Sequence, residues 1–331
     1  MKNRLLEIYV SDEHDPYANL ALEEFLCEHY EIGSKILLYL WQNDNTVVIG
    51  RNQNAYDQCY MKYIKEHNIK VARRLSGGGA VYHDLGNLNY TIICSNNLFS
   101  KEENTKMIVD SINKFGIQAV PSGRNDLVVN GYKISGTAYF TGRYASYQHG
   151  CIMVHSDQET MYKALRIRQD KIISKNIRSV YSRTVNLQEL CDSIDVRKLS
   201  IQIIKTFREK YVNNRVVPIG PIYKNANYKH LLQRYSSHSW NIKENADSKA
   251  DIYGRLSFGD CSIVFHVVEG MVLNTKIYTD SLLVDEILQA EEILSNIPYN
   301  KYSIIKVLEK YESDGNILRE LKELIQTEME N

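Results

Sequence analysis

The sequence has no hydrophobic run that approaches the roughly 20 residues needed to cross a bilayer as a helix. The first seven residues contain too short an apolar core for a secretory signal peptide. No C-x-x-C pair occurs among the six scattered cysteines, which are Cys27, Cys59, Cys94, Cys151, Cys191 and Cys261. We therefore expect reduced thiols in a cytoplasmic protein, and neither a disulfide framework nor a zinc site.

The chain also has no excess of either charge. Its 331 residues include 40 Lys and Arg and 40 Asp and Glu, so the formal net charge is zero. This balance gives no support for a nucleic acid or a membrane surface as the main partner. With 44% hydrophobic and 24% charged residues, the composition is that of a globular chain with room for two domains.

Helix and strand patterns alternate along the first 240 residues. Short apolar stretches predict strands over 36–40, 46–50, 88–94 and 148–154. Asp15-Pro16 predicts a helix start, and Ser100 with Glu103 has capping-box spacing. Further helices are expected near 157–166, 196–212 and 225–235. This alternation predicts an α/β or α+β core.

The polar stretch 243–249 resembles a linker between domains. Beyond it, strands are expected over Arg255–Phe258, Ser262–Glu269 and Met271–Thr279, with turns at Gly259-Asp260 and Glu269-Gly270. Three helices should follow, since two apolar stripes with helical spacing lie near 304–311 and 317–325. This pattern predicts a small α+β domain after the linker.

Three consecutive glycines, Gly77 to Gly79, follow Arg73-Arg74 and precede His83. Glycine is unfavourable inside helices and strands, but its bare backbone lets a ligand lie directly on amide N–H groups. The run lacks the Gly-Lys-Ser/Thr ending of a Walker loop and the G-x-G-x-x-G spacing of a dinucleotide fold. Taken alone, it indicates either an anion-binding loop or a structural glycine-rich loop.

A hairpin is predicted next, because Asn130-Gly131 between two apolar segments is typical of a tight turn. This turn would bring Asp126 near Lys133. The pair is either a surface ion pair of little energetic value or a carboxylate for a hard cation beside an ammonium for an anion. His149-Gly150-Cys151 and the basic segment 175–183 are two further clusters, each ambiguous by itself.

Together the four clusters resemble the lipoate–protein ligases. The matching elements are R-R-x-S-G-G-G-A-V-x-H-D-x-G-N, then N-D-L with K-x-S-G-x-A, then H-G, then K-x-x-x-S-V-x-S-R followed by Asn186-Leu187. Segments 15–24 and 46–54 fit the same family, so the similarity covers essentially the whole chain. The G-R-G-R-x-G arrangement of the related biotin ligases is absent.

This resemblance implies a mixed β-sheet catalytic domain of the biotin/lipoate ligase type, flanked by helices, at residues 1–245. A small α+β accessory domain would occupy residues 250–331. Lipoate, ATP and Mg²⁺ would give lipoyl-adenylate and pyrophosphate, and the lipoyl group would then pass to a lysine of a carrier domain. The carriers implied are the lipoyl domains of 2-oxoacid dehydrogenase E2 subunits, the glycine cleavage H protein, or both.

The resemblance also implies roles for individual residues. Lys133 would be catalytic, because two anions must meet and a positive charge must join them. Asp126 would hold Mg²⁺ with several waters, and Asn125 would orient the phosphates. Arg74 and segment 175–183 would close over the adenylate. The residues expected to bind lipoate or the adenylate are Arg74, Ser76, Gly77, Gly78, Gly79, Tyr82, His83, Asn87, Asn125, Ser135, Gly136, Ala138, His149, Gly150, Lys175, Ser179, Ser182 and Arg183.

Two alternatives remain open at this point. Cys151 follows His149-Gly150 where the ligases often have a small hydroxyl residue, and some relatives on this fold are octanoyl transferases that use a cysteine thioester. A buried strand cysteine that only fills space is the simpler interpretation. A non-catalytic module that binds lipoate or lipoyl domains is the second alternative, and the intact Lys133 and Asp126 weigh against it. No Ser-His-Asp set stands out in the sequence.

Overall fold

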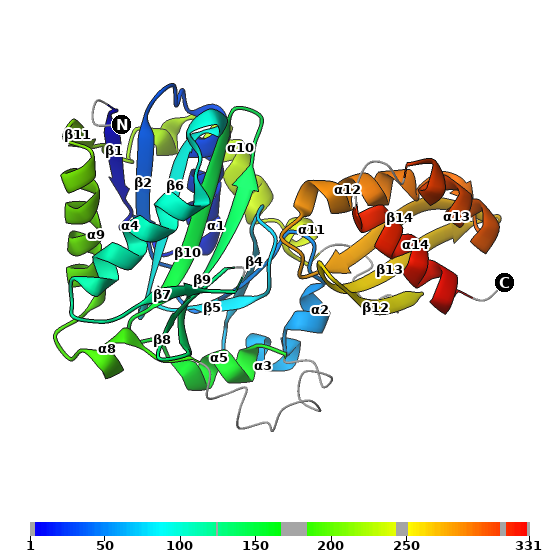
Figure 1. Ribbon diagram of the computed structural model, residues 1–331, viewed down its shortest axis with the longest axis horizontal. Coiled ribbons are helices and arrows are strands. Elements are labelled where there is room, and N and C mark those ends of the chain that lie inside the picture. The colour runs from blue at the N-terminus through cyan, green and yellow to red at the C-terminus, as the bar shows by residue number, and fades with distance from the viewer. Residues whose placement is uncertain (1–3, 124, 167–183, 243–250, 312–315, 330–331) are drawn as a thin grey trace.

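The computed structural model describes residues 4–123, 125–166, 184–242, 251–311 and 316–329 (Figure 1). An eight-stranded sheet and a three-stranded sheet form the larger part of the molecule, and a four-stranded sheet forms the smaller part. The smaller part, coloured yellow to red, lies at one end of the long axis in Figure 1. Strands and helices are mixed in both parts, which confirms the predicted fold class. None of the helices in the described ranges is long and apolar enough to cross a membrane.

The eight-stranded sheet has the order β11-β1-β2-β6-β10-β9-β8-β7. β11, β1 and β2 pair in parallel, and the other neighbours are antiparallel. The bounds are Leu6–Val10 (β1), Ile36–Trp41 (β2), Asn87–Ser95 (β6), Val120–Ser122 (β7), Asp126–Val129 (β8), Tyr132–Thr141 (β9), Ala145–Met153 (β10) and Asn214–Val216 (β11). The strands predicted over 36–40, 88–94 and 148–154 are therefore confirmed as β2, β6 and β10.

Helices cover both faces of this sheet. One face packs against α4 and α9, and the other packs against α1 and α10 (Figure 1). Their bounds are Pro16–Glu24 (α1), Lys101–Asn113 (α4), Val196–Lys210 (α9) and Ala226–Tyr235 (α10). Because successive strand residues point to opposite faces, Leu38 of β2 belongs to the first core cluster and Tyr39 to the second.

The helix starts agree with the capping signals. The Asp15 side chain accepts hydrogen bonds from the backbone N–H groups of Tyr17 and Ala18, and Ser100 caps α4 in the same way. After α1 the chain continues as a π-helical segment, Phe25–His29. Among the described residues of the larger part, the other α-helices are Ala55–Gln58 (α2), Met61–Glu66 (α3), Gln158–Ala164 (α5), Leu187–Leu190 (α8) and His238–Asn241 (α11). The helices predicted near 157–166, 196–212 and 225–235 are thus confirmed as α5, α9 and α10.

The three-stranded sheet carries the glycine loop. Its order is β4-β3-β5, with bounds Lys70–Arg73 (β4), Thr46–Ile49 (β3) and Val81–His83 (β5). The loop that contains Gly77 to Gly79 joins β4 to β5, so the predicted strand at 46–50 lies between the two strands that hold this loop.

The smaller part is an antiparallel sheet of order β12-β13-β14-β15 with helices on one face. Its bounds are Ile252–Leu256 (β12), Gly259–Val268 (β13), Met271–Thr279 (β14), Ile297–Pro298 (β15), Val284–Ile293 (α12), Lys301–Lys310 (α13) and Asn316–Glu328 (α14). The turn expected at Glu269-Gly270 is confirmed, and both residues have positive φ.

The turn expected at Gly259-Asp260 is wrong by two residues. The chain turns at Ser257 and Phe258 instead, because Gly259 already pairs with Leu256 across the β12–β13 ladder. Gly259 has φ +150, a conformation that favours glycine, which explains why it resembles a turn residue in the sequence.

The smaller part docks on the larger part through backbone contacts. The Gly78 N–H donates to the Ser281 carbonyl at 3.0 Å, and the Thr279 N–H donates to the Asn52 carbonyl at 2.9 Å. Because of the first contact, the chain that follows β14 lies directly on the glycine loop.

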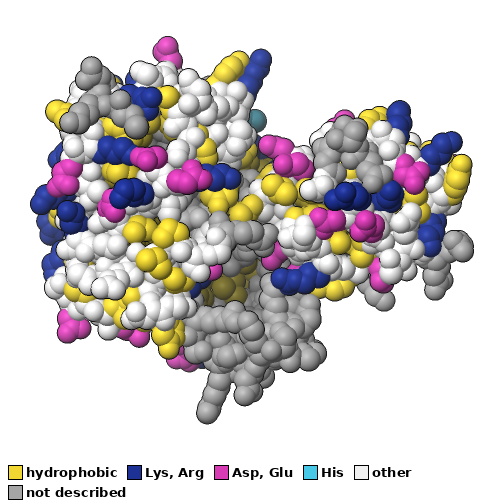
Figure 2. Space-filling view, viewed as in Figure 1, with side chains coloured by type: hydrophobic (Ala, Val, Ile, Leu, Met, Phe, Trp, Pro, Cys, Tyr) yellow, Lys and Arg dark blue, Asp and Glu magenta, His cyan; other side chains and the backbone are white. Residues whose placement is uncertain are grey.

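Figure 2 shows positive and negative side chains interspersed over the visible face of both parts.

Candidate active site

The predicted hairpin forms and brings the two charged residues together. Asn130 and Gly131 both have positive φ, as the tight turn requires. Lys133 Nζ lies 2.7 Å from Asp126 Oδ1, and each side chain is 37% exposed. Lys133 passes over Gly136, where an added Cβ would lie 3.2 Å from Nζ. The hairpin thus presents a half-exposed ammonium, and Gly136 leaves room for it.

Arg74 holds the glycine loop from beneath. Its guanidinium donates to the carbonyls of Val48, Gly77 and Gly79 and to Ser76 Oγ, and the side chain is buried. These donors face loop carbonyls, so Arg74 organises the glycine loop from one position. Arg74 also lines the central cavity, and its contact with an adenylate stays a prediction.

Arg73 has a related role one strand residue earlier. It is fully buried and donates to the carbonyls of Gly50, Arg51 and Gln53 and to those of Trp240 and Asn241. Burial lowers the pKa of Arg73. This residue joins the segment after β3 to α11, at the end of the larger part.

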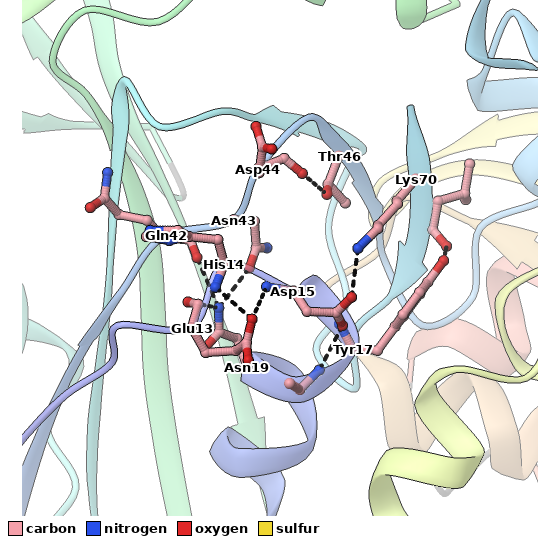
Figure 3. A network of polar contacts seen from close by, with 12 residues as sticks. Glu13, His14, Asp15, Tyr17, Asn19, Gln42, Asn43, Asp44, Thr46 and Lys70 are labelled. Atoms are coloured by element: carbon pink, nitrogen blue, oxygen red, sulfur yellow. Dashed lines mark hydrogen bonds and ion pairs between the residues drawn. The ribbon is translucent and has the colours of Figure 1, made fainter. Parts of the chain in front are cut away.

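A polar network fixes the wall beside β5. Asn19 of α1 donates to Asn43 Oδ1 at 3.1 Å, and Asn43 Nδ2 lies 3.2 Å from His83 Nδ1. Figure 3 shows Asn19 and Asn43 between the capped start of α1, where Asp15 pairs with Lys70, and the chain after β2. Burial, with Arg74 nearby, lowers the pKa of His83 to about 3. His83 is therefore a neutral polar wall and supplies no positive charge for an anion.

A buried acid–histidine–serine arrangement lies on the other side of the glycine loop. Glu23 Oε1 is 2.8 Å from His149 Nδ1, and His149 Nε2 is 2.8 Å from Ser76 Oγ. Sequence reasoning missed Glu23 and found no such set, since Glu23 and His149 are separated by 126 positions. The only sequence signal was the presence of Glu23 in the family-like segment 15–24.

The central cavity, of about 100 Å³, lies between the glycine loop and the sheet. The predicted residues that line it are Arg74, Gly78, Gly79, His83, Asn125, Lys133, Gly136, Ala138, His149 and Gly150. The lining residues that were not predicted are Leu20, Trp41, Val48, Ala80, Val81, Asn89, Thr137 and Cys151. The added residues are mostly apolar, so the cavity combines an apolar wall with a polar end at Lys133.

Some predicted residues lie elsewhere. Ser76 is buried behind the loop, and Gly77 faces the Ser281 carbonyl of the accessory part. Tyr82 packs in the core of the small sheet, its hydroxyl donating to Asn45 Oδ1. Asn87 and Ser135 are buried in their strands and are not among the lining residues. Lys175, Ser179, Ser182 and Arg183 lie outside the described residues.

Two further cavities meet the central one. A cavity of about 440 Å³ shares Asn125 and Thr137 with it and includes Asp126. Another, of about 380 Å³, shares Gly79, Ala80 and Lys133 and is walled on its far side by accessory residues, among them Tyr278. Lys133 thus stands where an apolar-walled cavity opens into polar space. In the described ranges no group of three or more His, Cys, Asp or Glu could enclose a metal ion.

Cys151 lies in the central cavity, two residues after His149 on β10. Burial raises the pKa of its thiol, although Lys133 and the Gly136 backbone oppose the shift. A thioester-forming cysteine needs the thiolate, which a raised pKa disfavours. The environment therefore weighs against the transferase alternative.

Comparison with known proteins decides the family. A model of the lipoyl protein ligase A/B catalytic domain matches residues 15–208, and a model of the bacterial lipoate protein ligase C-terminus matches residues 249–326. The chain belongs to the lipoate–protein ligase family. The resemblance inferred from the four motif clusters is thereby confirmed.

Individual relatives span nearly the whole chain. Lipoate-protein ligase LplJ of Bacillus subtilis is 32% identical over 320 residues, which is 93% of this chain and 95% of that protein. The structure of P. falciparum LipL1 in complex with lipoate matches with a TM-score of 0.84 and 29% identity over 98% of this chain and 100% of that one. A bi-partite lipoate protein ligase from Thermoplasma acidophilum, solved with its E2 lipoyl domain, has a TM-score of 0.61 and 25% identity over 73% and 97%.

Proposed function

We propose that this family member is an ATP-dependent ligase that activates lipoate and transfers the lipoyl group to a carrier lysine. The observation that carries the proposal is the position of Lys133, which lines both the apolar-walled cavity and the polar cavity beside the accessory part. Its ion-pair partner Asp126 lines the other polar cavity. An apolar acyl chain would lie in the first cavity, and its carboxylate would meet the nucleotide at this ammonium. Membership of the family supports this assignment.

In the first half-reaction, a lipoate carboxylate oxygen attacks the α-phosphorus of ATP, the α–β phosphoanhydride bond breaks and pyrophosphate leaves. The barrier is electrostatic, because two anions must approach each other. Lys133 would neutralise both in the transition state, and the glycine loop, where an added Cβ at Gly79 meets no atom within 4 Å, would add backbone donors. His83 is neutral, so it takes no part in neutralising these anions.

Mg²⁺ would neutralise the departing pyrophosphate. A single carboxylate, Asp126, suits an ion held mainly by phosphate oxygens and water, since Mg²⁺ usually keeps several waters. Asn125 lies beside it and is fixed by its Nδ2–H donating to the Thr137 carbonyl at 3.0 Å. The residues present therefore fit a nucleotide-bound magnesium ion better than a free protein site.

In the second half-reaction, the ε-amine of a carrier lysine attacks the lipoyl carbonyl carbon, AMP leaves and the amine loses a proton. The adenylate is already activated, so positioning of the amine would supply most of the acceleration. We propose lipoyl domains of 2-oxoacid dehydrogenase E2 subunits, the glycine cleavage H protein, or both, as carriers. The relative solved with its E2 lipoyl domain supports the first class.

We further propose a division into a catalytic domain, residues 1–245, and an accessory domain, residues 250–331. Separate hydrophobic clusters on the two sides support it, since the accessory cluster contains only residues from Ile252 onward. A cytoplasmic location is proposed as well. The unpaired state of all six cysteines agrees with a reducing compartment.

Lipoate-dependent exchange between ATP and pyrophosphate tests the function, because neither a transferase nor a binding module should catalyse it. Lys133→Ala should abolish exchange while the fold is retained, and Lys133→Arg should also fail, because a planar fork cannot replace a point donor in a tight site. Lys163→Ala, which removes a surface lysine paired with Glu159, is the matched control and should leave exchange unchanged. Near-normal exchange by Lys133→Ala would overturn the assignment.

A further inference from the structure

A buried chain of hydrogen bonds connects α1 to the glycine loop. It runs from Glu23 through His149 and Ser76 to Arg74, and none of these four side chains is more than 9% exposed. Glu23 Oε1 also accepts a hydrogen bond of 2.6 Å from Thr91 Oγ1. Since Arg74 and His149 line the central cavity, the chain joins two parts of the cavity wall that belong to different sheets.

The partners set the direction of each hydrogen bond. Arg74 can only donate, so Ser76 Oγ accepts from Arg74 Nε at 3.0 Å. The hydroxyl then has one hydrogen to donate, and His149 Nε2 is its one acceptor in the described part of the chain. A hydroxyl oxygen can also accept a second hydrogen bond, so Ser76 by itself does not fix the His149 tautomer. The Glu23 carboxylate can only accept, so it holds the hydrogen on Nδ1 and leaves Nε2 to accept from Ser76. One tautomer of His149 satisfies all four groups at once.

The arrangement resembles the triad of a serine hydrolase, but its environment gives it another role. Ser76 is fully buried, and its oxygen already accepts from a cation, which draws electron density away from a nucleophile. The Arg74 guanidinium beyond it donates to the Gly77 and Gly79 carbonyls. This chain of hydrogen bonds thus ends at the glycine loop, and no reacting bond lies at that end.

We propose that Glu23 is a positioning residue that fixes the tautomer of His149 and, through Ser76 and Arg74, the shape of the glycine loop. A buried, fully satisfied network of this kind rigidifies the groups it joins. The influence of Glu23 on lipoate activation rests on the proposed function, whereas its influence on His149 does not. Glu23 would act on the cavity without any contact with the reacting atoms.

Nitrogen NMR of protein labelled with ¹⁵N-histidine measures the tautomer directly. His149→Gln identifies the His149 resonances among those of the nine histidines. In the wild-type protein Nδ1 should be protonated and Nε2 unprotonated. Glu23→Leu, which removes the acceptor, should convert His149 to a mixture of tautomers, and Glu23→Gln, which keeps an acceptor oxygen, should restore the single tautomer.

Glu24→Gln is the matched control. Glu24 is the neighbouring buried carboxylate, but it pairs with Arg234 and accepts from the Tyr235 hydroxyl at 2.8 Å. Its loss should lower stability and leave the His149 resonances unchanged. A wild-type His149 protonated at Nε2, or an unchanged tautomer in Glu23→Leu, would overturn the proposal.

Where Glu23→Leu does not fold, Ser76→Ala tests the other end. The His149 Nε2 resonance should move towards that of a nitrogen without a donor, and an unmoved resonance would contradict the chain. Activity gives a second test by a double-mutant cycle in lipoate-dependent pyrophosphate exchange. Glu23→Leu and Ser76→Ala should each lower kcat/KM for lipoate by about tenfold, and the double variant also by about tenfold, because both break one chain.

Losses that multiply to about a hundredfold would show independent roles and refute the coupling. The two ideas can fail separately. If the wild-type protein shows no lipoate-dependent exchange, the proposed ligase function is wrong, while the NMR outcome still decides the role of Glu23.

Discussion

An alanine at position 77 should release the accessory part from the glycine loop. A Cβ on Gly77 would lie 2.2 Å from the Ser281 carbonyl oxygen and 2.8 Å from Leu282 Cα. Both are backbone atoms that no rotamer change can move. Ordinary contact begins at 3.4 Å, so the Ser281 carbonyl would have to retreat by about 1 Å or more.

That retreat would break the 3.0 Å hydrogen bond from the Gly78 N–H to Ser281 and weaken the 2.9 Å bond from the Thr279 N–H to Asn52. At about 1 kcal/mol for each full hydrogen bond, the docked arrangement loses about 1–2 kcal/mol. This loss lowers the ratio of docked to undocked molecules by about 5- to 30-fold. Gly77 does not have positive φ, so the alanine itself adds no backbone strain.

Small-angle X-ray scattering would measure the change as an increased radius of gyration, and calorimetry as separate unfolding of the two parts. Gly79→Ala is the matched control, because it lies on the same loop and a Cβ there meets no atom within 4 Å. It should leave docking intact. If the accessory part covers the site during activation, Gly77→Ala should also release more free AMP and lipoate in each turnover. Scattering from Gly77→Ala that superimposes on the wild-type curve would refute the reasoning.

Four further predictions concern single side chains. Asp126→Asn should raise the Mg²⁺ concentration needed for half-maximal exchange and affect transfer from preformed lipoyl-adenylate less; equal losses would indicate a structural role. Cys151→Ser should keep ligation within about tenfold of wild type; an acyl thioester trapped at this residue would instead support the cysteine-dependent transferase alternative. Arg73→Lys keeps at most three of five donated bonds, so it should cost about 2–6 kcal/mol in unfolding free energy, whereas the exposed Arg208→Lys should cost almost nothing; equal melting temperatures would contradict this. Unfolded His83 binds a proton near pH 6.5 and folded His83 only at about 3, so stability should fall as pH drops through that window, and His83→Asn should show a shallower decline in urea titrations; parallel declines would refute the assignment.

Local chemistry was readable from the sequence alone. Asn130-Gly131 predicts the tight turn because only residues that tolerate positive φ fit it, and the turn then brings Lys133 to Asp126. Asp15 and Ser100 predict two helix starts, because each cap binds N–H groups two or three residues away. The alternating pattern predicts the mixed fold, and the ordered motifs predict the family. The turn and capping signals each span only a few residues, and the family is identified by matching the order of short motifs.

The cavity, by contrast, depends on strand register. Trp41 of β2 faces Asn89 of β6, Asn89 faces Cys151 of β10, and Cys151 faces Gly136 of β9. This row across four strands forms much of the cavity wall. A shift of one residue in any strand would turn its members to the opposite face, and no local pattern specifies the pairing. Sequence reasoning therefore found Gly136 through its motif but missed Trp41 and Asn89.

Long-range contacts decided the rest. Glu23 reaches His149 across 126 positions, and Ser76 reaches His149 across 73. The sequence marks Glu23 only as a member of the family-like segment 15–24, and it gives no sign that the Ser281 carbonyl accepts from the Gly78 amide. A hydrogen bond depends on distances of about 3 Å and on which atoms are hidden from water, and both are fixed only when the chain packs. The sequence by itself determined which chemical groups this protein has and how each short segment folds, whereas the tertiary structure decided which of those groups meet.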